Sequence, residues 1–372
     1  MAPFNTPDSD DAAQREAIKN QLLGLIASAP AGSEIHGSIH LFTDGHLGTA
    51  LTEAHARGVK VKVLMDGDGR TAAGSEYAKL AKSTALGVDT AEDSFAFACD
   101  DARACIGNRT DLSKPPINHN KYFLFSETAG VRNVVFQTSA NLTSSQINVY
   151  YDNAVTVSRP ELYDAYKSYW NAQLKHGRGA GLPEYASTAQ AGPHEATFFP
   201  RATGDPITAL LDKADCRKVA AAEVTKIRVG TFAFTRREVA ERLVRLRQAG
   251  CQVYVFHNAE DGNLGAEVDR ALTAGRLNAY RGCRGTATDG TGAVRAIGLH
   301  SKYLLIEGTY DGVPNSKIVF TGSHDYTVPN LRGNDETVLR IDDRAVYDKF
   351  EHNFDDVLNG VAPKTGICGV SH

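Results

Sequence analysis

The octapeptides NHNKYFLF (residues 118–125) and LHSKYLLI (residues 299–306) show that this chain of 372 residues contains an internal repeat. Each octapeptide has a histidine, a lysine two positions later, and then an apolar run typical of a buried strand. Residues i and i+2 of a strand point to the same face of a sheet. We therefore expect His119 to project together with Lys121, and His300 together with Lys302.

The similarity continues on the N-terminal side of the two octapeptides. Residues 34–43 and 226–235 alternate between apolar and polar side chains like strands, and a helical segment follows each of them. Each helix ends near a glycine, Gly58 or Gly250, and a run rich in β-branched residues comes next. This order indicates a helix end and then a buried strand. Each half is therefore predicted to contain a β-α-β unit.

The similarity also continues on the C-terminal side. After a further strand, the turns TSANLT and GSHDYT occupy equivalent positions in the two halves. Ser139 in the first turn lies 13 positions before Asp152, and Ser323 in the second turn lies 13 positions before Glu336. We therefore expect an α/β fold of two similar halves, each a mixed β-sheet flanked by helices.

The connecting segments indicate where the halves divide. A stretch rich in Gly and Pro follows the helix expected to close the first half, at about 159–175, and a second closing helix is expected at about 343–358. The predicted division is an N-terminal half (1–176), a linker (177–195) and a C-terminal half (196–372). Two segments, about 67–116 and about 258–298, break the repeat and are interpreted as irregular insertions that shape the substrate site.

The composition is that of a globular protein, with 42% hydrophobic and 23% charged residues. The chain has no apolar run of about 18 residues, the length that would indicate a membrane span. Its formal net charge of −4 argues against a protein that binds nucleic acid mainly through a basic surface. Nucleic acid is therefore not the expected partner, although a local basic site is compatible with this charge.

Six cysteines bear on the compartment in which the protein works. Cys99 and Cys105 are close together in a loop-like segment, which favours a small disulfide and an oxidising compartment. The acidic start after Met1 resembles that of a mature secreted protein with an added initiator methionine. We therefore expect a secreted protein; the alternative is a cytosolic protein with scattered thiols, in which Cys251 is a small buried side chain. The sequence leaves open the pairing of Cys216, Cys251, Cys283 and Cys368.

The two histidine–lysine pairs supply what metal-free cleavage of a phosphodiester needs: a nucleophile, an acid for the leaving oxygen, and fixed positive charge. If the halves meet face to face, two imidazoles and two ammonium groups surround one phosphate. One neutral imidazole then attacks phosphorus to form a phosphohistidine, while the other, protonated, donates to the leaving alcohol. Water reverses these roles in a second step.

Polar residues near the two turns fit supporting roles. Ser139, Asn141 and Ser323 can donate hydrogen bonds to phosphate oxygens. Asp152 and Glu336 can each accept from the far ring nitrogen of a catalytic histidine and so fix its tautomer. The alternatives are turn formation for the first three and capping or pairing with arginine for the two carboxylates.

The duplicated His-x-Lys motif with its trailing serine-containing turns resembles the phospholipase D superfamily over nearly the whole chain. The resemblance implies two half-sites related by a pseudo-twofold axis, with no metal and no other cofactor. It also implies that His119 is the nucleophile and His300 the acid, with Lys121 and Lys302 beside them.

The sequence departs from the family motif at several positions. The aspartate expected after each His-x-Lys is replaced by Ser126 and Glu307, which are supporting positions, and Thr138 takes the place of a glycine. Asp325 takes the place of an asparagine in the phosphate-binding turn. A carboxylate there repels phosphate unless it is protonated or turned away.

Other uses of these residues have less support. A zinc site is disfavoured because a lysine beside each histidine repels a cation, and the sequence has no tight Cys/His cluster. It also has neither a Gly-x-Ser-x-Gly elbow nor a phosphate-binding glycine-rich loop. Four further histidines are interpreted as surface or packing residues: His36, His40, His46 and His55.

The sequence therefore predicts a secreted, monomeric phosphodiesterase of phospholipase D type. Its expected substrate is a phospholipid or lysophospholipid, reached by peripheral contact with a lipid surface, whose head group is hydrolysed or transferred. The alternatives are a nuclease of the same superfamily and a catalytically inactive binding protein with the same fold.

Overall fold

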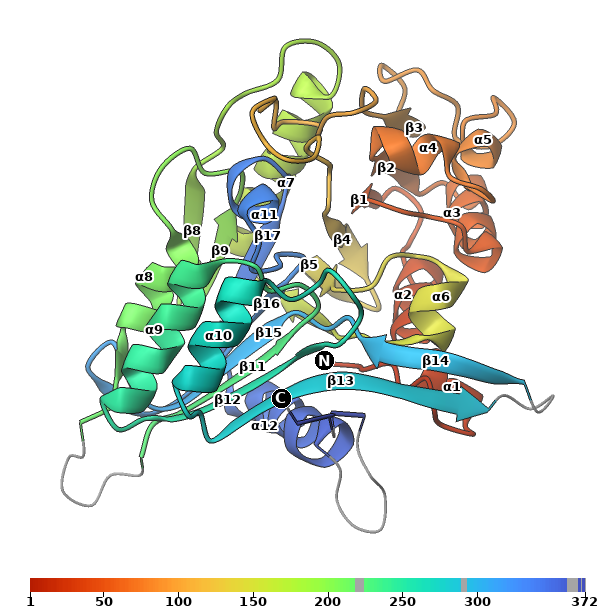
Figure 1. The fold of residues 1–372 in the computed structure, drawn as a ribbon. Helices are drawn as coiled ribbons and strands as arrows, with labels where there is room; N and C mark the ends of the chain where they lie inside the picture. Colours follow the sequence, from red (N-terminus) through yellow and green to blue (C-terminus); the bar gives the residue numbers. More distant parts are fainter. Residues whose placement is uncertain (218–223, 289–292, 360–366, 369, 372) are drawn as a thin grey trace.

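Two β-sheets, each with helices packed against it, form the two halves of the molecule (Figure 1). The computed structural model describes residues 1–217, 224–288, 293–359, 367–368 and 370–371. Parallel and antiparallel pairs occur in both sheets. The predicted α/β fold with two mixed sheets is confirmed.

The first sheet has the strand order β3-β2-β1-β4-β5-β7. β1 pairs parallel with β2 and antiparallel with β4, and β4, β5 and β7 are antiparallel to one another in turn. Its strands are β1 (Glu34–Ile39), β2 (Lys60–Met65), β3 (Phe95–Ala98), β4 (Lys121–Thr128), β5 (Val131–Thr138) and β7 (Ala154–Ser158). The helices of this half are α1 (Ala12–Arg15), α2 (Ala17–Ala27), α3 (Gly45–Ala56), α4 (Gly67–Thr71), α5 (Tyr77–Leu80), α6 (Ser144–Asn148) and α7 (Pro160–His176).

The second sheet repeats this pairing, with β11 parallel to β12 and antiparallel to β15, and with β15, β16 and β17 antiparallel in turn. Along the sheet its strands are β6 (Tyr150–Tyr151), β14 (Val294–Leu299), β13 (Ala279–Thr288), β12 (Gln252–Asn258), β11 (Lys226–Thr231), β15 (Tyr303–Tyr310), β16 (Val313–Gly322), β17 (Thr337–Asp342), β9 (His194–Phe198) and β8 (Ser187–Ala191). Two short strands lie beside this path, β10 (Ala214–Asp215) on β15 and β18 (Val370–Ser371) on β13. The helices are α8 (Pro206–Asp212), α9 (Arg237–Gln248), α10 (Ala266–Ala274), α11 (Val328–Arg332), α12 (Arg344–His352) and the π-helical turn η1 (Asn353–Leu358).

The predicted β-α-β units are present in both halves, as β1-α3-β2 and β11-α9-β12. The glycines that mark the helix ends have positive φ angles, +90° at Gly58 and +108° at Gly250. Side chains other than glycine rarely adopt this left-handed conformation, so these glycines end the helices and turn the chain into β2 and β12.

The structure corrects three expectations about local structure. The segments interpreted as irregular insertions contain regular elements: α4, α5 and β3 in the first, and α10, β13 and β14 in the second. The segment interpreted as a linker (177–195) contains β8 and the start of β9, and this hairpin joins the second sheet through β17. β4 begins only at Lys121 and β15 only at Tyr303, so both motif histidines precede their strands. The proposed division into two halves stays a prediction.

Helix α7 ties the first sheet to the hairpin of the second. It begins at Pro160 and packs against β5, β8 and β9, with an aromatic face that is buried in the core shared by both halves. Trp170 donates from Nε1 to the carbonyl of Gly37 in β1 at 2.8 Å. Tyr169 donates from its hydroxyl to the carbonyl of Phe199, just after β9, at 2.7 Å. These contacts fix the two sheets relative to each other.

Six cysteines form three disulfides in the structure: Cys99–Cys105, Cys216–Cys251 and Cys283–Cys368. The first is the small loop predicted from the sequence. The second corrects the alternative in which Cys251 is a lone buried thiol. The third links β13 to the C-terminal segment across 85 positions.

We expect the loss of Cys283–Cys368 to destabilise the protein more than the loss of Cys99–Cys105. A crosslink stabilises by restricting the unfolded chain, by about 4.5 kcal/mol for the long loop and about 2 kcal/mol for the short one. Urea unfolding of the double variants Cys283→Ser/Cys368→Ser and Cys99→Ser/Cys105→Ser, without reductant, measures this difference. An equal or reversed order would contradict it.

Candidate active site

Each motif histidine is fixed through its backbone to the opposite half of the molecule. The amide of His119 donates to the carbonyl of Asp335 at 3.0 Å, and the amide of His300 donates to the carbonyl of Tyr151 at 2.9 Å. Asp335 and Tyr151 occupy equivalent positions in the repeat, each one residue before a predicted supporting carboxylate. The backbone of each half therefore positions the histidine of the other.

The predicted supporting carboxylates are exchanged between the halves in the same way. Nδ1 of His119 lies 2.9 Å from Oε1 of Glu336, and Nδ1 of His300 lies 2.9 Å from Oδ1 of Asp152. Both carboxylates are buried. Because Nδ1 is taken up by a carboxylate, Nε2 is the nitrogen available for chemistry on each ring, and on His300 the Nζ of Lys302 lies 3.3 Å from it.

Two serine hydroxyls hold these carboxylates. Ser139 donates to Oδ1 of Asp152 at 2.7 Å, and Ser323 donates to Oε2 of Glu336. A serine has one hydroxyl hydrogen, and here each serine gives it to a carboxylate. The expected contact of Ser139 and Ser323 with phosphate therefore stays a prediction.

Glu336 has two further donors that the sequence analysis did not single out. The side-chain amides of Asn330 and Asn334 both donate to its Oε1. Asp152 lacks such partners: its Oδ2 is buried without a hydrogen bond in the described part of the chain. No pattern in the sequence marks the two asparagines, because Gln146 and Tyr150 occupy the equivalent positions of the first half.

Both motif lysines are buried beside their histidines. Nζ of Lys121 donates to the carbonyl of His119 at 2.6 Å, and Nζ of Lys302 donates to the carbonyl of His300 at 2.8 Å. Burial lowers the pKa of Lys121 to about 7, and the carboxylate of Glu336 opposes this shift. The structure thus brings the four predicted catalytic side chains together as two neighbouring pairs.

Burial also sets the protonation of the histidine–carboxylate pairs. Burial and the adjacent lysines lower the pKa of His119 and of His300. Burial raises the pKa of Asp152 to about 7 and the pKa of Glu336 to about 8, with the lysines opposing both shifts. In each pair, burial therefore makes the carboxylate easier to protonate and the imidazole harder to protonate than in water.

Asp325 is turned toward protein groups. Its Oδ1 accepts from the amide of Ala233 at 3.1 Å, and its Oδ2 lies 3.7 Å from Nζ of Lys302. Burial raises the pKa of Asp325. These features reduce the repulsion that a carboxylate would exert on phosphate. Asn141, its counterpart in the first half, has a buried Oδ1 without a partner among the described residues, and its phosphate contact stays a prediction.

The residues that replace the family aspartates have structural partners. Oγ of Ser126 accepts from the amide of Glu34 at 2.8 Å, which ties β4 to the start of β1. Glu307 pairs with Lys226 at 3.2 Å and with Arg228 at 3.6 Å. Both replacements therefore support the sheets at a distance from the histidines along β4 and β15.

His40, interpreted from the sequence as a surface or packing residue, packs beside a motif histidine. Its ring centroid lies 5.4 Å from that of His119, and its Nδ1 is buried without a hydrogen-bond partner in the described part of the chain. Phe232, the equivalent residue of the second half, lies 4.6 Å from His300 between ring centroids. The sequence contains a signal for this placement, because His40 and Phe232 directly follow the first strand of their repeats. Of the other three, His36 packs on Trp170, whereas His46 and His55 are exposed.

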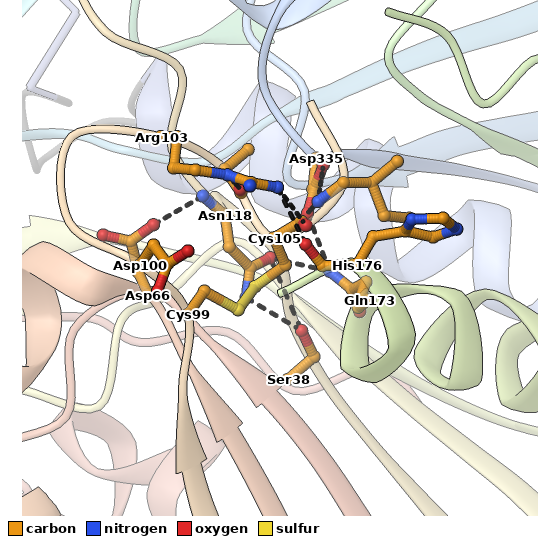
Figure 2. Close-up of a disulfide and its surroundings, with 12 residues drawn as sticks. Ser38, Asp66, Cys99, Asp100, Arg103, Cys105, Asn118, Gln173, His176 and Asp335 are labelled. Atoms are coloured by element: carbon orange, nitrogen blue, oxygen red, sulfur yellow. Dashed lines mark hydrogen bonds between the residues drawn. A yellow bond between two sulfur atoms is a disulfide. The ribbon is translucent and has the colours of Figure 1, made fainter. Parts of the chain in front are cut away.

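The loop closed by Cys99–Cys105 is connected through Asp335 and Gln173 to Asn118 (Figure 2), the residue before His119. The carboxylate of Asp335 accepts from the two backbone amides that follow Cys105, at 2.9 and 3.0 Å, and from Gln173 at 3.3 Å. Gln173 also donates to Oδ1 of Asn118 at 2.9 Å. The residue before His119 and the residue that accepts from its amide thus belong to one buried network.

Two histidine–lysine pairs on a duplicated α/β fold define the class of protein. A match to a family model indicates the same class. The family model described as "Cardiolipin synthase, PLD-like domain" matches residues 22–174 and 216–358. The chain therefore belongs to the phospholipase D superfamily, with two copies of the PLD-like domain.

Two solved structures share the fold over most of the chain. Phosphatidylserine synthase of Haemophilus influenzae Rd KW20 is similar with a TM-score of 0.59 and 14% identity, over 95% of this chain and 85% of that one. Polyphosphate kinase from Porphyromonas gingivalis has a TM-score of 0.57 and 16% identity, over 95% of this chain and 46% of the kinase. This chain thus spans less than half the length of the kinase, and at these identities the likeness concerns the fold alone. No curated protein matches the sequence.

We expect Glu336→Gln to remove most of the activity and leave the fold intact. The amide can keep the contacts with His119 and Ser323, but it lacks the charge that stabilises a developing imidazolium, so kcat should fall by about 10² to 10⁴. Steady-state kinetics and the melting temperature measure the two effects. Glu53→Gln, an exposed glutamate in α3, is the matched control. A kcat for Glu336→Gln within twofold of the wild type would rule out this role.

Proposed function

We propose that the protein is a phosphodiesterase of phospholipase D type that hydrolyses or transfers the head group of a phospholipid or lysophospholipid. The observation that carries the proposal is the exchange of carboxylates, which engages Nδ1 of both histidines. Nε2 of each ring is then the nitrogen that can react with phosphate, and on His300 it lies 3.3 Å from Nζ of Lys302. Lys302 and His300 of the second half also lower the pKa of His119, after the larger effects of burial and Lys121. Both features are compatible with a single phosphate bound between the two imidazoles.

In the first step, Nε2 of neutral His119 attacks phosphorus and forms the N–P bond. The P–O bond to the head group breaks, and its oxygen takes the proton from Nε2 of His300. The products are a phosphohistidine at His119 and the free head-group alcohol. The buried ammonium groups of Lys121 and Lys302 stabilise the negative charge that builds up on the phosphate oxygens.

In the second step, water attacks phosphorus and gives its proton to His300 as the N–P bond to His119 breaks. The enzyme returns to its starting protonation, and the lipid product is a phosphomonoester. An alcohol in place of water would give transfer of the phosphatidyl group by the same proton movements.

The substrate class is inferred from charge and compartment. The formal net charge of −4 does not favour a polyanionic nucleic acid as substrate, which sets the lipid proposal above the nuclease alternative. Three disulfides fit an oxidising, extracellular compartment in which such lipids are met at membrane surfaces. Within the described residues, no helix has the length and apolar character needed to cross a membrane.

The mechanism requires an ionised Glu336 and a proton on the His300–Asp152 pair. These two requirements should give a bell-shaped dependence of kcat/KM on pH. His119 needs an ionised Glu336, whose raised pKa is about 8, so activity should fall as the pH is lowered through that region. His300 must hold a proton with Asp152, whose pKa is about 7, so activity should fall again as the pH rises. Loss of the proton from Lys121, whose pKa is also about 7, adds to that fall. Both limbs should lie near neutral pH, and the acidic limb should be absent in Glu336→Gln. An acidic limb that is unchanged in the variant would contradict the assignment.

The proposal predicts a phosphoenzyme on His119 that forms without metal. Purified protein in excess chelator should release choline or ethanolamine from phospholipid vesicles and leave single-stranded DNA intact. An alkaline quench of labelled substrate followed by peptide mapping should place the label on His119. His119→Ala and His300→Ala should each lose nearly all turnover, whereas the control His46→Ala, with an 81% exposed side chain, should retain it.

Three outcomes would overturn this proposal. Cleavage of DNA without release of a head group would favour the nuclease. Loss of activity in chelator would count against the metal-free mechanism. Label on a residue other than a motif histidine would contradict the proposed phosphohistidine intermediate.

A further inference from the structure

We propose that a surface hollow of about 230 Å³ between α8 and the strands β17 and β9 is a second ligand site, for a single-chain alkyl phosphate. The phosphate is held by Arg201, Lys213 and Arg340, and the alkyl chain lies on the apolar floor of the hollow. The inference is drawn from the residues that line the hollow, and it does not depend on the proposed function.

The hollow lies where the second sheet extends beyond its helical cover. The first sheet ends at β7, whereas the second continues past the equivalent strand β17 to β9 and β8. The helix at this place, α8, packs on α9 as α2 packs on α3, but it has 7 residues where α2 has 11. Figure 1 shows α8 beside β8 and β9. The sheet surface between α8 and the β8–β9 hairpin is therefore open to a ligand.

The floor of the hollow is apolar and continues inward. It is formed by Ile207, Leu210, Phe320 and Val338, and all of these except Leu210 are buried. The same four residues also line a smaller cavity of about 20 Å³, whose inner wall includes Lys302. An alkyl chain gains free energy on such a surface because it leaves water. The floor therefore selects a ligand with an apolar chain.

Two guanidinium groups at the rim lack a full set of partners. Nε of Arg340 is buried without a hydrogen bond in the described part of the chain, and Nη2 reaches Oδ2 of Asp342 only at 3.5 Å. Arg201 donates to two backbone carbonyl oxygens, but among the described residues it has no carboxylate at ion-pair distance. Burial lowers the pKa of Arg201, and Glu184 and Glu195 oppose this shift. An anion in the hollow would supply the acceptors and the negative charge that these groups lack.

The carboxylates near the rim leave room for a ligand. Among the described residues, Glu195 is the one carboxylate in the lining. Lys213 pairs with Asp311 at 3.2 Å and Arg340 with Asp342 at 3.5 Å, but both acids lie outside the lining, with side chains 58% and 37% exposed.

Exposed ion pairs of this kind contribute little, so their cations can be shared with a ligand. A phosphate monoester carries up to two negative charges and three free oxygens. It therefore matches three cations better than a carboxylate does.

Calorimetric titration with octyl phosphate, below the concentration at which it forms micelles, tests the site directly. We expect a Kd of about 0.1 mM or tighter. Inorganic phosphate lacks the chain, octanol lacks the charge, and octanoate has a smaller charge, so each should bind at least about tenfold more weakly. The same site should appear in His119→Ala, which alters the active site and leaves the hollow unchanged.

Two variants and a matched control locate the binding. Arg340→Gln removes charged donors from the rim and should weaken binding about tenfold. Ala209→Trp fills the hollow from an exposed position of α8 and should abolish binding, which keeps the test decisive if Arg340→Gln does not fold. Arg245→Gln removes the same charge from an exposed position of α9 and should keep the wild-type affinity.

Four results would overturn the site. The first is no binding of octyl phosphate by the wild type. The second is binding that is lost in His119→Ala, which would place the ligand in the active site. The third is an affinity that neither Arg340→Gln nor Ala209→Trp changes. The fourth is octanoate binding as tightly as octyl phosphate, which would remove the phosphate from the ligand class.

Discussion

The site depends on the exchange of carboxylates between the two halves, because neither half supplies the partner for its own histidine. Glu336 holds His119, and Asp152 holds His300, each at 2.9 Å. A buried imidazole or carboxylate without a partner would cost several kcal/mol, so docking of the halves and formation of the site are one event. The backbone bonds from His119 to Asp335 and from His300 to Tyr151 enforce the same alignment, and α7 holds the sheets in place around them.

The repeat produces two half-sites with the same motif but different surroundings. Glu336 accepts from Ser323, Asn330 and Asn334, whereas Asp152 accepts from Ser139 and has an oxygen without a hydrogen bond among the described residues. An imidazole lies beside His119, and a phenyl ring lies beside His300. A nucleophile and an acid need opposite protonation at the same pH. In the proposed mechanism, these local differences would allow the duplicated motif to provide both protonation states at once.

The sequence predicts the repeat, the two mixed sheets, the Cys99–Cys105 disulfide and the residues that gather at the site, because these follow from local patterns and from equal spacing. It does not predict that Asp152 serves His300 rather than His119, since the two contacts join residues 148 and 217 positions apart. It likewise does not show that His40 packs beside His119, because the only signal is its position in the repeat, directly after the first strand. Short elements such as β3 (Phe95–Ala98) and the β8–β9 hairpin carry too few residues for a clear periodicity, so they were expected as irregular segments.

The central claim is that both imidazoles act on one phosphorus atom from opposite sides. A crystal structure of the protein with vanadate, which mimics five-coordinate phosphorus, tests this most directly. The account predicts a single vanadate bonded to Nε2 of His119, with its opposite apical oxygen within hydrogen-bond distance of Nε2 of His300 and with both lysines near the equatorial oxygens. Vanadate bound to one histidine while the other faces a separate pocket would contradict it.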